Sequence, residues 1–354
     1  MSDKVLMKGT DAIAEAAIRA GCRCYFGYPI TPQNEIPEYM ARRMPEVGGV
    51  FLQGESEIAS INMVHGAVAA GVRTMTSSSS PGISLKQECL SFLATQELPA
   101  VIVNIMRGGP GLGNIAPNQG DYYQATRGGG HGDYRMPVIA PGSIQELYDL
   151  TMDAFDIADK FRSPVLILGD GMMGQMMEPI VIHEKPEVEL PEKDYILDGA
   201  RGRHGRVLKS LILNARGMEE QNWKLKRKYD LMRQELPRCE EYMTDDAKLV
   251  VVAYGTAARI AKGAVKRARA GGLQVGIFRP VTLWPFPDSA LLEVAKKAKL
   301  FLVFEMSTGQ MIDDVKLAVG NRIECEFYGR PGGVIPQPKE IERIIERLWL
   351  QKEL

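Results

Sequence analysis

Glu57 is the residue in this sequence whose type and position most clearly invite chemistry. It is a carboxylate at the head of a segment that is otherwise small and apolar through to residue 71. If Ser56 is the N-cap of a helix, Glu57 shares a face with Ile61, Val64 and Val68, and this face should point inward. The spacing therefore places an acid on the apolar side of a predicted helix.

Two interpretations of Glu57 are open at this point. An exposed carboxylate at the positive end of a helix dipole is common and contributes only about 0.3 to 1 kcal/mol. A carboxylate on an apolar face instead predicts contact with a ligand or a partner group, because an unpaired buried charge is costly. Glu55 precedes the cap and is freer to face water.

Thr31 and Arg107 are further candidates, because each follows an apolar strand at a turn rich in glycine or proline. Their segments are "GYPITPQ" (27–33) and "RGGPGLGN" (107–114). Arg107 directly follows its predicted strand, so its charged side chain must point away from the apolar sheet. Thr31 before Pro32 predicts an N-cap followed by proline at the first helical position.

Other motifs are incomplete. The glycines of "GGPGLGN" miss the third glycine of G-x-G-x-x-G, and "SSSSPG" is not a G-x-S-x-G nucleophile elbow. The serine run "SSSSPG" instead predicts a tight turn from strand to helix. The five cysteines and four histidines are scattered and give no metal-ligand spacing, so no metal site is predicted in this chain.

Composition narrows the class of protein. The chain has 354 residues, 45% of them hydrophobic and 25% charged, and a net charge of -1. These values are ordinary for a globular protein and give no reason to expect nucleic acid or an anionic membrane as partner. Without an apolar leader or spanning segment, we expect a cytoplasmic protein with no membrane contact.

The elements that must position these residues alternate between helix and strand periodicity. Strands are expected near 24–29, 49–53, 72–78, 99–106 and 164–170, and helices near 9–21, after Thr31, and at 56–71, 82–96 and 143–161. A polar loop is expected over 107–142. This alternation predicts a parallel sheet with helices on both faces, and ligands bind beyond the carboxyl ends of such strands. The three loops that carry Thr31, Glu57 and Arg107 should lie at that edge.

The pattern changes after about residue 175. We expect one domain over 1–180, a charged linker or arm over 181–244, and a second, smaller domain over 245–354. The arm carries alternating charge along a predicted helix and has too little apolar surface for its own core. A solvated arm is favoured, and docking to another subunit is the alternative. The predicted fold class is α/β, with two doubly wound domains.

Seven segments, taken in order, resemble the 2-oxoacid:ferredoxin oxidoreductases, specifically the alpha-type chain of the multi-subunit enzymes. They are "GYPITP" (27–32), "ESEIASINMVHGAVAAG" (55–71), "TSSSSPGISL" (76–85), "VIVNIMRGGPGLGN" (101–114), "GGGHGDYR" (128–135), "ILGDGMMGQMMEP" (167–179) and "FRPVTLWPFP" (278–287). The resemblance covers nearly the whole chain.

The resemblance implies an enzyme that oxidatively decarboxylates a 2-oxoacid, using thiamine diphosphate, coenzyme A and ferredoxin, to acyl-CoA and carbon dioxide. It implies a thiamine pyrimidine-binding domain over 1–180 and a transketolase C-terminal-like domain over 245–354. Thiamine diphosphate would be shared with a beta subunit that carries the diphosphate-binding domain. Magnesium and iron–sulfur clusters would lie in partner subunits only, among them gamma and iron–sulfur subunits.

The resemblance also implies roles for single residues. A Glu at the position of Glu57 hydrogen-bonds the aminopyrimidine ring nitrogen and favours the imino form that takes the proton from the thiazolium carbon. Thr31 and Arg107 resemble the pair that holds the substrate carboxylate and 2-oxo group, for which arginine offers a two-pronged fit. The remaining cofactor-binding candidates are Tyr28, Pro29 and Ile30.

The substrate is expected to be a branched-chain 2-oxoacid, because the sequence is most similar to the 2-oxoisovalerate-type enzymes. A 2-oxoglutarate enzyme is the near alternative and would need a second cation, which Arg127, Arg135 or residues of a partner chain could supply. Two more distant alternatives are a nicotinamide-dependent dehydrogenase and a non-catalytic scaffold chain.

Overall fold

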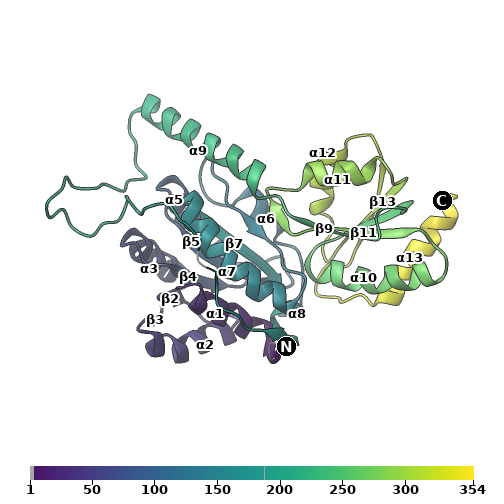
Figure 1. Ribbon diagram of the computed structural model, residues 1–354, viewed down its shortest axis with the longest axis horizontal. Coiled ribbons are helices and arrows are strands. Elements are labelled where there is room, and N and C mark those ends of the chain that lie inside the picture. The colour runs from purple at the N-terminus through teal and green to yellow at the C-terminus, as the bar shows by residue number, and fades with distance from the viewer. Residues whose placement is uncertain (1–3, 187) are drawn as a thin grey trace.

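The computed structural model describes residues 4–186 and 188–354. Seven strands form the first sheet, on the left of Figure 1. They are β2 (Cys24–Gly27), β3 (Val50–Gln53), β4 (Thr74–Ser78), β5 (Ala100–Met106), β6 (Val138–Ile139), β7 (Pro164–Asp170) and β12 (Thr282–Trp284). Their order is β12-β6-β7-β5-β4-β2-β3. All neighbours run parallel except β12, which pairs antiparallel with β6.

Helices cover both faces of this sheet. One face carries α1 (Gly9–Arg19), α2 (Glu35–Arg43) and α7 (Ile144–Phe161). The other carries α3 (Glu57–Ala69), α4 (Pro81–Ser84), α5 (Gln87–Thr95) and α9 (Ala215–Glu235). The chain therefore leaves β2 toward one face and β4 toward the other, which makes the gap between these strands a topological switch point. Ligand sites of open α/β sheets form beyond the carboxyl ends of strands at such a point.

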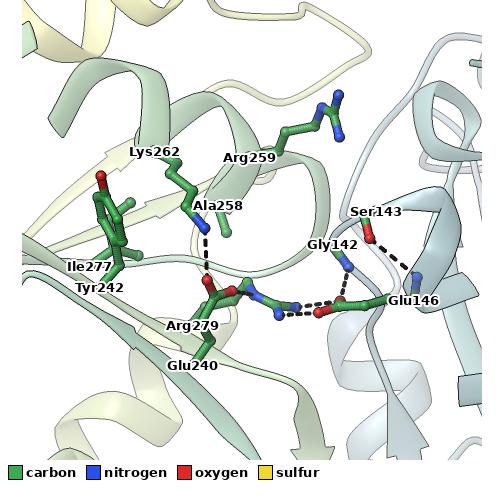
Figure 2. A pocket seen from close by; sticks show the side chains of 10 residues that line it. All are labelled: Gly142, Ser143, Glu146, Glu240, Tyr242, Ala258, Arg259, Lys262, Ile277 and Arg279. Carbon is green, nitrogen blue, oxygen red and sulfur yellow. Dashed lines mark hydrogen bonds and ion pairs between the residues drawn. The ribbon is translucent and has the colours of Figure 1, made fainter. Parts of the chain in front are cut away.

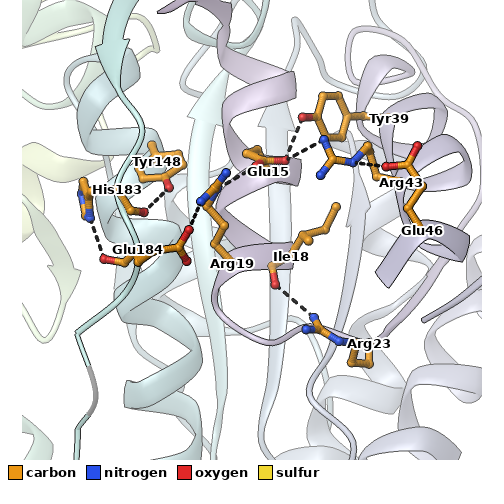
Figure 3. Close-up of polar contacts among 10 residues, drawn as sticks. All are labelled: Glu15, Ile18, Arg19, Arg23, Tyr39, Arg43, Glu46, Tyr148, His183 and Glu184. Carbon is orange, nitrogen blue, oxygen red and sulfur yellow. Dashed lines mark hydrogen bonds and ion pairs between the residues drawn. The ribbon is translucent and has the colours of Figure 1, made fainter. Parts of the chain in front are cut away.

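Polar contacts fasten α1 to α2 on the first of these faces (Figure 3). Glu15 is 3% exposed and accepts hydrogen bonds from Arg19 Nε at 2.7 Å and from the Tyr39 hydroxyl at 2.9 Å. Arg43 lies 3.6 Å from the same carboxylate. Burial and the nearby Glu15 charge both raise the pKa of Tyr39, because both disfavour a phenolate.

The second sheet has five strands and lies on the right of Figure 1. They are β9 (Cys239–Tyr242), β10 (Leu249–Val252), β11 (Val275–Pro280), β13 (Leu300–Glu305) and β14 (Glu324–Gly329), in the order β14-β13-β10-β11-β9. Only β9 is antiparallel to its neighbour. Helices α10 (Gly255–Ala270) and α13 (Pro338–Gln351) cover one face, and α11 (Asp288–Ala295) and α12 (Met311–Val319) pack on the other.

A buried arginine joins the two sheets (Figure 2). Arg279, at the end of β11, donates from both terminal nitrogens to Glu146 of α7, at 2.6 and 3.0 Å, and from Nε to Glu240 at 2.8 Å. Lys262 donates to the other oxygen of Glu240 at 2.7 Å. The cavity beside these residues has a volume of about 280 Å³. Its charged groups are used in pairs, so the network ties the second sheet to the first.

The predicted fold class is confirmed, and several local expectations need correction. Helix α2 begins at Glu35 instead of directly after Thr31. The helix expected over 82–96 is interrupted between α4 and α5, at Leu85 and Lys86. The loop expected over 107–142 contains α6 (Tyr122–Arg127) and β6. Both are too short to leave a periodic pattern in the sequence.

Further elements lacked a periodic sequence pattern. Strand β1 (Lys4–Lys8) pairs antiparallel with β8 (Met177–Val181) in a separate two-stranded sheet. Two short helices, η1 (Pro45–Val47) and α8 (Gly171–Gln175), follow α2 and β7. Within residues 188–214, the chain extends away from the first sheet before it reaches α9 (Figure 1).

Helix α9 packs against the first sheet's helices instead of being solvated on all sides. Leu225, Tyr229 and Met232 lie on one face of α9 and are buried. Lys228 lies 3.3 Å from Glu97, which follows α5. Among the residues described, no helix is long and apolar enough to cross a membrane.

Candidate functional site

Glu57 is the first residue of α3 and is buried, with 6% of its surface exposed. The Ser56 hydroxyl accepts a hydrogen bond from the Ala59 backbone nitrogen at 3.1 Å, so Ser56 is the N-cap, as predicted. Glu55 is exposed. The buried residues on the same face of α3 include Ile61, Val64 and Val68. The start of α3 therefore places Glu57 inward, whereas Glu55, before the N-cap, faces water.

Glu57 differs from the other buried acids in having no partner. Six of the seven buried acidic side chains have hydrogen bonds or ion pairs: Glu15, Glu97, Asp159, Asp170, Glu305 and Asp314. Within the described residues, no hydrogen bond or ion pair reaches the Glu57 carboxylate. A buried carboxylate without a partner is costly, so this position points to a group that the chain itself does not supply.

Glu305 shows what a structural buried acid looks like here. It is fully buried at the end of β13 and accepts hydrogen bonds from the backbone nitrogens of Gln310, Met311 and Ile312 and from the Ser307 hydroxyl. Burial raises the pKa of Glu305, whereas these donors oppose the rise by stabilising the ionised form. The donors give Glu305 a role in closing the start of α12. Nothing comparable surrounds Glu57.

Gly82, in α4, makes room for the Glu57 carboxylate. A Cβ atom on Gly82 would lie 2.5 Å from Glu57 Oε1 and 2.1 Å from Ser78 Oγ. Both distances are far below van der Waals contact, so only glycine lets α4 approach these side chains without displacing them. The carboxylate thus lies against bare backbone at the carboxyl end of β4.

Unpartnered polar atoms gather at this edge of the sheet. Ser78 Oγ, Ser79 Oγ and Gln33 Nε2 are buried and have no hydrogen-bond partner among the described residues. Ser78 is the last residue of β4 and Ser79 follows it, whereas Gln33 follows β2, on the other side of the switch point. Buried polar groups are nearly always hydrogen-bonded in folded proteins. Ser78 Oγ lies with Glu57 against Gly82. Unpartnered polar atoms at this edge of the sheet fit a polar ligand such as an aminopyrimidine, or a partner chain.

Arg107 and Thr31 lie in contact at the ends of β5 and β2. Arg107 Nη1 donates to the Thr31 carbonyl oxygen and Nη2 donates to the Leu112 carbonyl oxygen, each at 3.0 Å. Each terminal nitrogen carries a second hydrogen, which is left for another acceptor. The Nε atom is buried without a partner. The guanidinium is therefore oriented by the chain and retains donors.

The prediction that Thr31 caps a helix is wrong. Thr31 lies in a turn in which the Gln33 backbone nitrogen donates to the Ile30 carbonyl oxygen at 3.1 Å, and α2 starts only at Glu35. The Thr31 side chain receives instead a hydrogen bond from Asn34 Nδ2 at 3.4 Å. Its carbonyl is held by Arg107, which draws the turn toward β5 and delays the helix.

The remaining candidates lie in the same loop after β2. Tyr28 and Ile30 are half-buried, and Pro29 is exposed. No hydrogen bond between described residues links Glu57 to Thr31 or Arg107. The structure thus forms two groups at one edge: Thr31 with Arg107, and Glu57 with Gly82.

A hydrogen-bonded network that the sequence analysis missed supports Arg107. The Ser80 hydroxyl donates to Asp121 at 2.6 Å and accepts from the Arg107 backbone nitrogen at 3.0 Å. Asn104 Nδ2 donates to the same Asp121 oxygen at 2.9 Å, and Asn104 Oδ1 accepts from the Ser80 backbone nitrogen. Burial raises the pKa of Asp121. Ser80 has a φ of 26°, a value that these contacts maintain.

The sequence contained one clue to this network, the serine run at the end of a predicted strand. The contact with Asp121 joins residues 41 positions apart, so no local pattern announces it.

Metal ligands are not clustered in the described part of the chain. No three His, Cys, Asp or Glu side chains there are placed to hold a metal ion, and the five cysteines are free. The polar atoms at the site described above are amide, hydroxyl, guanidinium and carboxylate groups. These suit an organic ligand with donors and acceptors.

Comparison with known families gives two matches. The family described as "Pyruvate flavodoxin/ferredoxin oxidoreductase, thiamine diP-bdg" matches residues 15–238. The family described as "Pyruvate:ferredoxin oxidoreductase core domain II" matches residues 247–341. The first match contains every candidate site residue.

Two curated relatives represent two substrate classes. Ketoisovalerate oxidoreductase subunit VorB of Methanothermobacter marburgensis is 50% identical over 343 residues, which are 97% of this chain and 97% of the relative. The 2-oxoglutarate synthase subunit KorA of Archaeoglobus fulgidus is 40% identical over 348 residues, or 96% and 98% of the two chains.

Among solved structures, a 2-oxoglutarate:ferredoxin oxidoreductase from Magnetococcus marinus, with 2-oxoglutarate, coenzyme A and succinyl-CoA bound, has a TM-score of 0.87 and 26% identity. The match covers 98% of this chain but 65% of that chain. A split gene transketolase has a TM-score of 0.57 at 12% identity, which shows a shared fold alone.

Proposed function

Because this chain belongs to the pyruvate flavodoxin/ferredoxin oxidoreductase family, we propose that it is the alpha-type subunit of an enzyme that oxidatively decarboxylates 2-oxoisovalerate. The products are the branched-chain acyl-CoA, carbon dioxide and reduced ferredoxin. The observation that carries the proposal is the buried Glu57, whose carboxylate has no hydrogen bond or ion pair with any described residue and lies with the unpartnered Ser78 Oγ against Gly82.

Glu57 is proposed to bind the aminopyrimidine ring nitrogen of thiamine diphosphate. Thiamine diphosphate, when bound, would supply the carbanion chemistry of the decarboxylation. The work of this chain is to hold a proton between Glu57 and the ring nitrogen, which favours the imino form of the pyrimidine. Glu57 is 6% exposed and lies against Gly82, which limits the number of water molecules that can reach that proton.

Arg107 and Thr31 are proposed to bind the substrate. A guanidinium with two free hydrogens on adjacent nitrogens fits a carboxylate, and the Thr31 hydroxyl lies on the turn that Arg107 holds. Tyr28, Pro29 and Ile30 are proposed to line the pyrimidine. These two groups of residues flank the switch point between β2 and β4, as expected for cofactor and substrate that meet.

The cofactor is proposed to be shared between chains. Magnesium binding to a diphosphate needs a cluster of oxygen ligands, and a beta subunit is proposed to supply it. Gamma and iron–sulfur subunits are proposed to carry the clusters that pass electrons to ferredoxin. The proposed division of this chain is a pyrimidine-binding domain over 1–180, an arm over 181–244 and a transketolase C-terminal-like domain over 245–354.

Two observations favour a branched-chain substrate over 2-oxoglutarate. Identity to the ketoisovalerate relative is 50%, against 40% for the 2-oxoglutarate relative. Arg127, a candidate for a second substrate carboxylate, is engaged by both oxygens of Asp314, at 3.1 and 2.7 Å. The other candidate, Arg135, donates to two backbone carbonyls. Arg127 is therefore neutralised by an ion pair, and Arg135 keeps its charge with only Nη1 engaged among the described residues. Leu112, on the loop held by Arg107, is 80% exposed and apolar.

The test is an assay of the purified complex with a panel of 2-oxoacids, coenzyme A and ferredoxin. We expect kcat/KM for 2-oxoisovalerate to exceed that for 2-oxoglutarate by at least tenfold. A preference for 2-oxoglutarate would show that the proposed substrate is wrong, while the proposed class of reaction would stand. Absence of thiamine-dependent ferredoxin reduction with every 2-oxoacid would reject the proposed function.

A further inference from the structure

Lys86 is a buried lysine between α4 and α5 that the mechanism above does not use. It is 0% exposed, and its Nζ atom donates to Thr76 Oγ1 at 2.5 Å and to the Ser77 carbonyl oxygen at 3.4 Å. Both acceptors are uncharged groups of β4. Within the described residues, Lys86 has no ion pair. A buried ammonium without a contacting carboxylate is expensive, so its presence needs a reason.

Among charged groups, Glu57 has the largest influence on the pKa of Lys86. The Glu57 carboxylate lies against Gly82, and Lys86 follows Gly82 by four residues, which is about one helical turn. Burial lowers the pKa of Lys86 to about 7, and the charge of Glu57, together with that of Cys89 when its thiol is ionised, opposes that change. Burial also raises the pKa of Cys89 to about 12, so that thiol is neutral near pH 7. Glu57, whose carboxylate lies against Gly82 one turn before Lys86, is left as the acid whose charge acts on Lys86.

We propose that Lys86 is a positioning residue that sets where the proton shared by Glu57 and the aminopyrimidine resides. When the Glu57 O–H bond breaks and the ring nitrogen gains the proton, negative charge stays on the Glu57 carboxylate. The positive charge of the Lys86 ammonium stabilises that carboxylate charge. A neutral Lys86 leaves the proton on Glu57 and disfavours the imino form. This inference rests on the proposed function, because it assumes that Glu57 binds the pyrimidine.

The first test uses the full chain without thiamine. The titration of Lys86 Nζ is followed by NMR in a lysine-labelled chain, with and without Glu57→Gln. We expect a midpoint near pH 7 that falls to a lower pH in the variant, because the opposing carboxylate is gone. An unchanged midpoint would overturn the coupling. This test needs no substitution of Lys86 and therefore does not depend on how such a variant folds.

The second test uses the assembled complex loaded with thiamine diphosphate and no 2-oxoacid. Hydrogen–deuterium exchange at the thiazolium C2 position is measured for the unmodified protein, Lys86→Met and Lys86→Arg. We expect exchange about 10- to 100-fold slower in Lys86→Met, the range for a charge-assisted contact. Because the amine loses its proton near pH 7, this deficit should shrink as pH rises from 6 to 9. Lys86→Arg keeps the charge and should restore most of the rate.

Lys228→Met is the matched control. Lys228 also has a pKa lowered by burial, to about 8, but it pairs with Glu97 beside α9. Exchange at the unmodified rate is expected there. A Lys86→Met complex that exchanges at the unmodified rate at every pH would overturn the role of Lys86. A Glu57→Gln complex that does so would instead reject the proposed function, so the two failures are distinguishable.

Discussion

The guanidinium of Arg107 holds the carbonyl of Thr31 at 3.0 Å and thereby ties the end of β5 to the end of β2 across the switch point. Strand β4 lies between these two strands. The contact fixes the loop that carries the cofactor-binding candidates relative to the strand that carries the proposed substrate-binding charge. Substitution of Arg107 should therefore affect position as well as charge.

Arg107→Lys should weaken substrate binding far more than cofactor binding. A lysine ammonium that held both carbonyls would have one hydrogen left, so it could not also make the two-pronged contact with a carboxylate that arginine offers. The loss is expected to cost about 1.5 to 3 kcal/mol in substrate affinity. Apparent KM for the 2-oxoacid, with thiamine affinity measured in parallel, checks this. Equal losses for both ligands would show that the loop collapses instead.

Glu57→Gln should leave thiamine bound but slow decarboxylation, because glutamine keeps the size of the side chain and removes the acid. Contributions of this kind are typically about 100- to 10,000-fold in rate. Ferredoxin reduction by the reconstituted complex is the measurement. Glu55→Gln is the control, since Glu55 is exposed one residue before the N-cap. Full activity in both variants would mean that Glu57 only complements the helix dipole.

Gly82→Ala should lower thiamine affinity at least tenfold, because its methyl group would overlap Glu57 Oε1 and Ser78 Oγ. Binding is measured by titration of the assembled complex. Gly66→Ala is the control: Gly66 lies in α3, the helix of Glu57, and an added Cβ there meets nothing within 4 Å. This substitution should stabilise the helix by up to about 1 kcal/mol. Unchanged affinity in Gly82→Ala would contradict the described position of the carboxylate.

Lys86→Met should stabilise the full chain against unfolding, and more so at low pH. The folded-state pKa of Lys86 is about 7, below its ordinary value of 10.5. The unfolded chain therefore binds more protons between these values, and the unmodified protein gains stability as pH rises from 7 to 10.5. Denaturant unfolding at pH 6 and pH 9.5 is the measurement. The advantage of Lys86→Met should be larger at pH 6, and a constant difference would be inconsistent with a buried, titrating amine.

The strands that carry the site were predictable because their sequences leave few alternatives. The continuous apolar run of β5 reads as a strand buried on both faces, and the alternation with helices predicts a parallel sheet. The inward direction of Glu57 followed from one N-cap and the spacing of Ile61, Val64 and Val68, all of which are short-range facts. The ordered motifs supplied the family.

What the sequence hid depends on contacts between distant residues. The turn at Thr31 is shaped by Arg107, 76 positions away, which overrides the capping preference of threonine before proline. Lys86 looks like a solvated charge in the sequence, and only its placement between α4 and α5 shows that it is buried. The contact between Ser80 and Asp121 was likewise not predictable, because the two residues are 41 positions apart. Local propensity carries no information about such pairs.

Strand β12 limits how this gene product can be divided. Its three residues come from the second half of the chain, yet they complete the outer margin of the first sheet beside β6. A cut near residue 245 would leave the amino-terminal fragment with an unsatisfied strand edge, and such edges recruit other chains. Co-expression of residues 1–244 with 245–354 should therefore rescue a fragment that aggregates alone. Engineering that exchanges one half between relatives must therefore carry the three residues of β12 along with the first sheet.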